Sequence, residues 1–241
     1  DLGPYTGAEI LLRVDVVTDD AVNAPGLALD DLAIPAIGWQ DLRTVGDCLV
    51  WQAEGLRLAP NQSATKLAHL LDLADPDRNR DLCFGTVDSW LVWTLTEGAR
   101  HVTDRTNAAV TGLLDRDAST WQTSVLDALR LPTGALPEII DSTGEIGTAT
   151  ALAGAPRITG MAGDQQASMI GQGCVLPGMT KITFGTGGML DMWLGDSGPA
   201  SAERSASGTF PIVTMGHQGA TWWGLEAIML SAGTNVDWLC D

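Results

Sequence analysis

Two short motifs just past the middle of the chain constrain its fold more than any other feature. Gly-Asp-Gln-Gln at residues 163–166 follows a strand-like stretch and opens a helical pattern, which predicts Asp164 at a helix N-terminus. Gly-Thr-Gly-Gly at residues 185–188 lies between two apolar stretches and is typical of a tight hairpin loop. A carboxylate at a helix start and a hairpin whose N–H groups can hold phosphate are what phosphoryl transfer to a hydroxyl requires.

Each motif alone also has a purely structural interpretation. A helix N-terminus favours an ionised carboxylate by about 0.3–1 kcal/mol, so Asp164 is expected to be an acceptor even if it only caps its helix. The glycines of residues 185–188 permit close approach of a ligand, and Thr186 adds a hydroxyl for a phosphate oxygen or a metal-bound water. An ordinary turn explains the same residues, so spacing alone leaves both interpretations open.

Composition narrows the class of protein. The 241 residues are 45% hydrophobic, enough for one large or two smaller domains, and the formal net charge of −17 argues against a nucleic-acid partner. There is no stretch of roughly 20 uninterrupted apolar residues and no basic start followed by an apolar core, so we expect no membrane association and a cytoplasmic location.

The cysteines predict neither a disulfide framework nor a zinc site. They are widely spaced, with no Cys-x-x-Cys pair and no His nearby in the sequence. We therefore interpret all four as reduced thiols in or near the core: Cys48, Cys83, Cys174 and Cys240.

Residues 37–150 have helical periodicity that predicts three amphipathic helices, whereas residues 1–36 are poorly periodic, with residues 15–20 at best an isolated strand. The predicted start signals are Ser63, Thr86 and a capping box of Ser119 and Gln122, and the predicted stops are Gly98 and Pro132. The side chains expected on the buried faces are Leu67, Leu70 and Leu71, then Trp90, Leu91 and Trp93 or Leu95, then Val125, Leu126 and Leu129.

From residue 155 onward the pattern predicts strands. Residues 155–162 read as a short strand leading to the helix of Asp164, which carries Met169 and Ile170. Two β-hairpins are predicted next, with loops at residues 185–188 and 216–219, and a helix follows them. We interpret His217 in the second loop as a surface turn residue and not as a catalytic base.

Two common nucleotide-binding motifs are missing from the sequence. It contains no Gly-x-x-x-x-Gly-Lys-Ser/Thr and no Gly-x-Gly-x-x-Gly after a strand. A hairpin type of phosphate loop, as in actin-like ATPase domains, is the remaining interpretation.

Five segments in order carry a specific resemblance. Residues 37–44, 84–91, 101–108, 163–167 and 184–187 resemble the FGGY carbohydrate kinases, and within that family the kinases that act on glycerol. The resemblance implies an α/β fold of the actin-like ATPase (ribonuclease H-like) type, incomplete at both ends. It also implies an acceptor-binding N-terminal domain over residues 37–173 and the start of a nucleotide-binding domain over residues 178–241, with residues 1–36 unassigned.

The resemblance also implies roles for individual residues. Asp164 corresponds to the general base, Gln165 to a neighbour that orients the polyol, and Trp39 to an aromatic side chain that packs on its carbon chain. The positions that correspond to nucleotide-binding residues are Gly185, Thr186, Gly187 and Gly233. The implied ligands are a small polyol or sugar and ATP with Mg²⁺, with no protein metal ligands assigned, and a homo-oligomer is implied by the family alone.

The sequence departs from the family at the acceptor site. Asn61 stands where a binding tyrosine is expected, Met189 stands where an aromatic residue is expected after the glycine loop, and residues 1–36 contain no Arg-Glu pair to grip polyol hydroxyls. The sequence therefore defines the reaction better than the acceptor, and glycerol is favoured over other polyols or ketoses such as xylulose.

Two departures concern the ends of the chain. No Asp-x-Gly-Thr-like hairpin precedes residue 37 unless residues 1–4 are a trace of it, and residues 238–241 precede the segments that usually complete an adenine pocket. We expect little or no kinase activity from these 241 residues alone. The alternatives are a non-catalytic remnant or binding module of the same fold and, less favoured, an actin- or chaperone-like ATPase.

Overall fold

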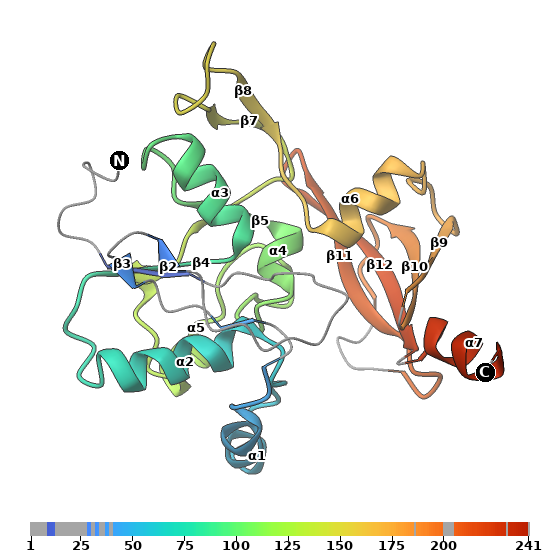
Figure 1. The fold of residues 1–241 in the computed structure, drawn as a ribbon, viewed down its shortest axis with the longest axis horizontal. Helices are drawn as coiled ribbons and strands as arrows, with labels where there is room; N and C mark the ends of the chain where they lie inside the picture. The colour runs from blue at the N-terminus through green and yellow to red at the C-terminus, as the bar shows by residue number, and fades with distance from the viewer. Residues whose placement is uncertain are drawn as a thin grey trace.

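The computed structural model describes residues 9–12, 28–29, 32–33, 37–38, 41–185, 187–199, 205–229 and 231–240. Trp39, Thr186 and the predicted strand at residues 15–20 lie outside these ranges. Figure 1 shows a helix-rich part that contains α1 to α5 and, beside it, a twisted antiparallel sheet, β9 to β12, that α6 crosses. This arrangement places the helix of Asp164 between the two parts.

The helix-rich part contains short parallel strand pairs with helices packed around them. Strand β1 (Glu9–Leu12) pairs in parallel with β4 (Leu82–Gly85), and β5 (Val102–Asp104) pairs in parallel with β6 (Glu138–Ile140). Strands β2 (Ala28–Leu29) and β3 (Leu32–Ala33), and strands β7 (Thr143–Thr148) and β8 (Arg157–Gly160), form antiparallel pairs. The helices are α1 (Val45–Ala53), α2 (Ser63–Ala74), α3 (Val87–Leu95), α4 (Arg105–Ala109), α5 (Thr123–Ala128) and the 3₁₀ turn η2 (Thr133–Ala135).

The main core of this part forms where α2, β4 and α5 meet. As predicted, Leu67 and Leu71 of α2 are buried, and Leu126 of α5 packs in the same cluster. The other buried members are Ala64, Ala68, Leu82, Phe84, Leu113, Val125, Leu129, Leu131 and Leu136. Because α2 places apolar residues three and four positions apart, one stripe of the helix faces this core.

Helix α3 begins after Thr86 as predicted but buries a different face. Its buried residues are Asp88, Ser89 and Val92, whereas Leu91 is 53% exposed. Polar Asp88 can face inward because hydroxyl groups of Thr86 and Thr103 donate to its carboxylate. The predicted Trp90, Trp93 and Leu95 are half-buried.

The predicted capping box ahead of α5 is wrong. Gln122 is the N-cap residue, and no side-chain cap hydrogen bond forms there. Ser119 instead donates its N–H to the Asp115 carboxylate at 2.9 Å, and the Thr120 hydroxyl donates to the same carboxylate at 2.8 Å. The charged acceptor on Asp115 thus competes successfully for the donors of Ser119.

The C-terminal part is a four-stranded antiparallel sheet in the order β11-β12-β10-β9. Its strands are β9 (Thr180–Phe184), β10 (Gly188–Gly195), β11 (Phe210–His217) and β12 (Ala220–Met229), followed by α7 (Gly233–Cys240). Both predicted hairpins are confirmed. The second loop is shorter than predicted, because only Gln218 and Gly219 separate its strands, with φ of 51° and 78° as a tight hairpin turn requires.

Helix α6 (Asp164–Gly171) packs on one face of this sheet. Met169 is fully buried and packs in a cluster with Cys174 and with Trp193 of β10. Met215 and Trp222 of β11 and β12 pack against the same cluster. The helix is therefore held to three strands of the sheet by apolar contacts.

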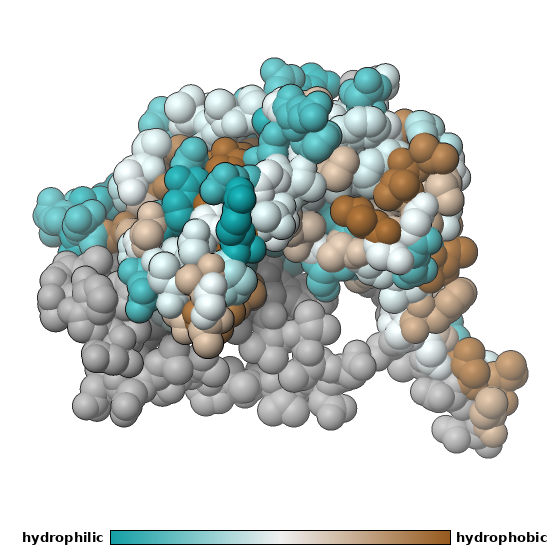
Figure 2. Space-filling view, turned by 90° about the horizontal axis from the view of Figure 1, so that it is seen from above, coloured by the Kyte–Doolittle hydropathy of each residue, from teal (hydrophilic) through white to brown (hydrophobic). Residues whose placement is uncertain are grey.

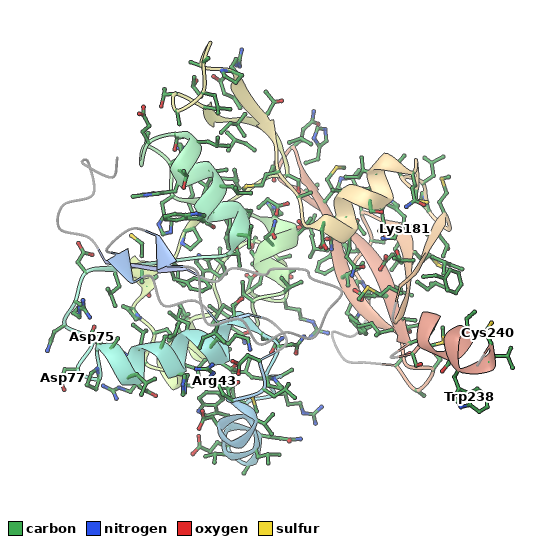
Figure 3. All side chains as sticks on the ribbon, in the orientation of Figure 1. Arg43, Asp75, Asp77, Lys181, Trp238 and Cys240 are labelled. Atoms are coloured by element: carbon green, nitrogen blue, oxygen red, sulfur yellow. The ribbon has the colours of Figure 1, made fainter. Side chains whose placement is uncertain are left out.

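The cysteine prediction is confirmed for pairing and partly wrong for burial. All four cysteines are free, Cys48 and Cys174 are buried, and Cys83 is half-buried. Cys240 is exposed because α7 carries it outward at the end of the chain, next to Trp238 (Figure 3).

Exposed apolar side chains gather at the sheet and at α7, where Figure 2 shows brown patches on the right of the view. Phe184 at the end of edge strand β9 is 75% exposed, and Trp238 and Leu239 of α7 are 79% and 78% exposed. Covering such a surface with further chain would be favourable. None of the described helices has the length and apolar character needed to span a bilayer.

Candidate functional site

Two hydrogen bonds, one to α4 and one to β11, fix the first turn of α6. Gly163 donates its N–H to Thr106 Oγ1 at 2.8 Å, and Gln166 donates its side-chain N–H to the carbonyl of Val213 on β11 at 3.2 Å. A Cβ at Gly163 would lie 2.5 Å from Gln166 Oε1, so a larger residue here would displace the end of the Gln166 side chain, which binds Val213. Asp164 is held at the helix start with an exposed side chain, and its Oδ1 accepts the N–H of Gln165 at 2.9 Å.

Thr106 belongs to a buried network around the Asp104 carboxylate. Thr106 Oγ1 lies 2.8 and 2.9 Å from the two carboxylate oxygens, Ser142 Oγ donates at 2.5 Å, and the N–H of Asn107 donates at 3.0 Å. Ser142 Oγ also accepts the N–H of Gly216 on β11 at 2.9 Å. The network therefore connects α4, the start of α6 and the C-terminal sheet.

Gln165, the second residue of α6, contacts the hairpin that β9 and β10 form. Its side-chain amide nitrogen contacts Met189 Sδ on β10, and its backbone carbonyl lies 3.5 Å from the Lys181 ammonium on β9. Lys181 and Asp191 face each other across the β9–β10 register, 3.0 Å apart between Nζ and Oδ2. The hairpin thus presents Met189 and a buried ion pair to the first turn of α6.

The three predicted nucleotide-binding glycines meet at the loop that connects β9 and β10. Gly185 donates its N–H to the carbonyl of Gly187, and Gly233 at the start of α7 donates its N–H to the carbonyl of Gly185, both at 2.8 Å. We call these three residues the glycine junction. Because the N–H groups of Gly185 and Gly233 are used within it, phosphate binding at this loop would rely on other N–H groups or on opening these bonds.

A buried lysine connects two segments that are predicted to bind the acceptor, the one after Trp39 and the one that contains Asn61. Lys66 on α2 is 2% exposed, and its ammonium donates to the carbonyl of Asp41 at 2.6 Å and of Pro60 at 2.7 Å. This brings the segment that follows Trp39 next to the loop that carries Asn61, whose side chain is exposed. The predicted contact of Trp39 lies outside the described residues.

The acceptor-side loop and α6 are connected through α4 and the residues after it. Ala64 at the start of α2 donates its N–H to the carbonyl of Thr111 at 2.8 Å, and Thr106 within α4 binds Gly163. The helix that follows the Asn61 loop and the helix of Asp164 are therefore both anchored on the segment of residues 106–111.

Comparison with known proteins connects this arrangement to a family. Residues 29–171, more than half of the chain, match the FGGY family of carbohydrate kinases, N-terminal domain. The chain belongs to the FGGY family.

The FGGY relatives most similar in sequence include glycerol kinases. The glycerol kinase of Alkalilimnicola ehrlichii is 44% identical over 223 residues, and that of Alcanivorax borkumensis is 40% identical over 224 residues. Each match covers 86% of this chain and 44% of the relative. The chain therefore spans about half the length of the curated relatives it matches.

Solved FGGY structures confirm the fold. The structure of Plasmodium falciparum glycerol kinase with ADP superposes with a TM-score of 0.73 at 26% identity, covering 84% of this chain and 43% of that one. A xylulose kinase from Rhodospirillum rubrum superposes with a TM-score of 0.71 at 21% identity, covering 88% of this chain and 45% of that one. The predicted α/β fold of the actin-like ATPase type is confirmed.

Two buried carboxylates near the candidate site, those of Asp191 and Asp104, were not predicted from the sequence. Asp191 is a lone acidic residue inside the apolar strand β10, and such a residue in a buried strand predicts a charged partner. Asp104 in Thr-Asp-Arg-Thr-Asn has the pattern of a helix N-cap, and its side chain caps α4. Both signals were available in the sequence, but their partners lie in other elements.

Burial shifts the titration of two acidic groups in this part of the molecule. Burial raises the pKa of Asp88 to about 6, although the hydroxyl groups of Thr86 and Thr103 lower it, and the Asp104 carboxylate raises it. Burial also raises the pKa of Asp191, against the lowering effect of Lys181, and the Asp164 carboxylate raises it further. Of these influences that of Asp164 is the smallest, so Lys181 is the main charge that acts on Asp191.

The described residues contain no group of three or more His, Cys, Asp and Glu side chains that could hold a metal ion. Mg²⁺ in nucleotide sites is usually held by phosphates, water and one or two carboxylates and not by a protein cage. A Mg²⁺ ion that arrives with the nucleotide therefore needs no such group of protein ligands at this site.

Proposed function

We propose that the protein containing this chain transfers a phosphoryl group from ATP to a hydroxyl of a small polyol, with glycerol to glycerol 3-phosphate as the favoured reaction. The observation that supports this most is the placement of Asp164. Its exposed carboxylate begins α6, and the next residue, Gln165, contacts Met189 on the hairpin whose loop belongs to the glycine junction. An acceptor hydroxyl bound beside Asp164 would face a nucleotide phosphate held at that junction.

The arrangement suits the chemistry of phosphoryl transfer. In a loose transition state, positioning and charge neutralisation dominate, so a carboxylate that accepts the hydroxyl proton late is sufficient as a base. Asp164 would accept that proton, while Gln165 and Met189 would contact the acceptor from the hairpin side and Asn61 and Trp39 from the N-terminal side. Mg²⁺ bound with the nucleotide would neutralise phosphate charge.

Glycerol is favoured as the acceptor because the glycerol kinases named above are 40% and 44% identical to this chain. A ketose such as xylulose is the second candidate. Met189 stands where an aromatic side chain is expected, and its flexible thioether can adapt to acceptors of different shape.

Location and assembly follow from the same proposal. Four free thiols fit a reducing compartment, so we place the protein in the cytoplasm. A homo-oligomer is an expectation from the family that light scattering on the purified protein would test.

The test is a kinase assay on the protein from the complete reading frame and, in parallel, on the 241-residue chain. With ATP and Mg²⁺ we expect glycerol to be phosphorylated faster than xylulose, ribulose or erythritol by the first protein, and little or no turnover by the second. Asp164→Ala should lower kcat by a factor on the order of 10²–10⁴.

The matched control is Asp127→Ala, which removes an exposed carboxylate on α5 and should leave kcat unchanged. Unchanged turnover in Asp164→Ala would refute the assignment of the base. ATP binding without turnover of any acceptor would favour a non-catalytic binding module.

A further inference from the structure

A fully buried ion pair lies beneath the first turn of α6. The side chains of Lys181 on β9 and Asp191 on β10 are 2% and 0% exposed, with Nζ 3.0 Å from Oδ2. Within the described residues, Asp191 Oδ1 has no hydrogen-bond partner, so the carboxylate is stabilised mainly by the charge of one ammonium group. Burying two charges for this little hydrogen bonding is costly, which favours a purpose other than stability.

The surroundings of the pair indicate what it contacts. The Lys181 ammonium lies 3.5 Å from the carbonyl of Gln165, and Met189, two residues before Asp191 on the same face of β10, touches the Gln165 side chain. Figure 3 labels Lys181 in the region where α6 overlies the sheet. The pair therefore supports the residue next to Asp164.

The charges around the pair are few. Among the described residues, the charged groups that face Asp191 are Lys181 on β9, Asp164 on α6 and Glu226, its register partner on β12. Lys181 and Asp191 together carry no net charge. The Glu226 carboxylate is the same in the wild type and in the variants below, so the loss of one partner of the pair changes the charge near Asp164 by one unit.

We propose that Lys181 and Asp191 are positioning residues for Asp164, holding the first turn of α6 in place on the hairpin that carries the glycine junction. Only the expected effect of these residues on turnover rests on the proposed function. Its structural content, that the pair orders the start of α6, stands on the contacts above.

The kinetic test compares two variants of the complete protein. Asp191→Asn leaves an unpaired ammonium near Asp164, so the acidic limb of the kcat pH profile should move by about one unit to lower pH. Lys181→Met/Asp191→Leu removes one charge of each sign and keeps the wild-type net charge, so the limb should stay at the wild-type pH. Because the double variant loses the contact with Gln165, its kcat should fall by about 10-fold, with KM for ATP unchanged.

A second measurement does not need turnover. Ala167 donates its N–H to the carbonyl of Gly163 at 2.8 Å and closes the first turn of α6. In the double variant this amide should exchange with solvent about 10-fold faster than in the wild type. If the wild type has no kinase activity, the proposed function fails, and this exchange rate still decides the positioning role.

The matched control is Arg157→Met/Glu145→Leu. It removes an exposed ion pair of 2.7 Å between β8 and β7 and should change neither the pH profile nor the exchange of Ala167. An unmoved acidic limb in Asp191→Asn, or wild-type kcat and Ala167 exchange in the double variant, would overturn the proposal.

Discussion

Asp104 and Asp191 are both fully buried carboxylates, but their surroundings differ. Asp104 accepts hydrogen bonds from the hydroxyl groups of Thr106 and Ser142 and from Asn107, most of them a few residues away in sequence. Asp191 faces one ammonium and, among the residues that the structure describes, one of its oxygens has no hydrogen-bond partner. The first environment fixes backbone segments through many directional bonds, whereas the second depends on one charge and responds to any change in it.

The largest effect should come from breaking the ion pair on one side. Lys181→Met leaves the Asp191 carboxylate buried without a counter-charge, and we expect the free energy of unfolding to fall by about 3–5 kcal/mol. Lys181→Met/Asp191→Leu should recover most of that loss, because apolar side chains of similar size carry no desolvation cost. Urea unfolding of the wild type and both variants measures this, and equal losses in the single and the double variant would contradict it.

The next effect is a pH dependence of the unfolding free energy. It arises at Asp88, a buried carboxylate that, like Asp104, is bound by hydroxyl groups and not by an ammonium group. The pKa of Asp88 is raised to about 6 in the folded protein, so the folded state binds its proton more tightly than the unfolded chain. The resulting stability is present below the unfolded pKa and is lost as pH rises through 6. A shift of two units corresponds to about 3 kcal/mol between pH 4 and 7.

Unfolding free energies of the wild type and Asp88→Asn over this pH range check the assignment. The variant has no titrating group at this position, so the difference between the two proteins should change with pH by that amount. Parallel curves for both proteins would show that Asp88 does not titrate as described.

The smallest effect is expected for an ion pair in water. Arg157 and Glu145 lie 2.7 Å apart, but their side chains are 62% and 70% exposed. Replacing both should change the unfolding free energy by about 0–1 kcal/mol, because solvent screens the attraction and the side chains lose entropy on pairing. Thermal unfolding at low and high salt measures this, and a loss as large as that of Lys181→Met would remove the contrast between buried and exposed pairs.

Local patterns predicted much of the fold, and contacts between distant segments account for the rest. The strand before Asp164, the helix it begins and both hairpins follow from periodicity and turn residues. The buried face of α3 and the start of α5 do not, because Thr103 and Asp115 compete for polar groups that an isolated helix would leave to solvent or to its own cap. The sequence motifs predicted residues at the surface of the candidate site, whereas the buried Lys181–Asp191 pair becomes visible only in the register of β9 with β10.

Lys66 has a practical consequence beyond its role in joining two loops. Its ammonium is enclosed with the carbonyls of Asp41 and Pro60 as partners, so an amine-directed reagent can reach it only when these segments separate. The rate at which this one amine is modified therefore reports how often the segments that contain Asp41 and Pro60 separate. It can be followed by mass spectrometry with or without a ligand, whatever reaction the protein catalyses.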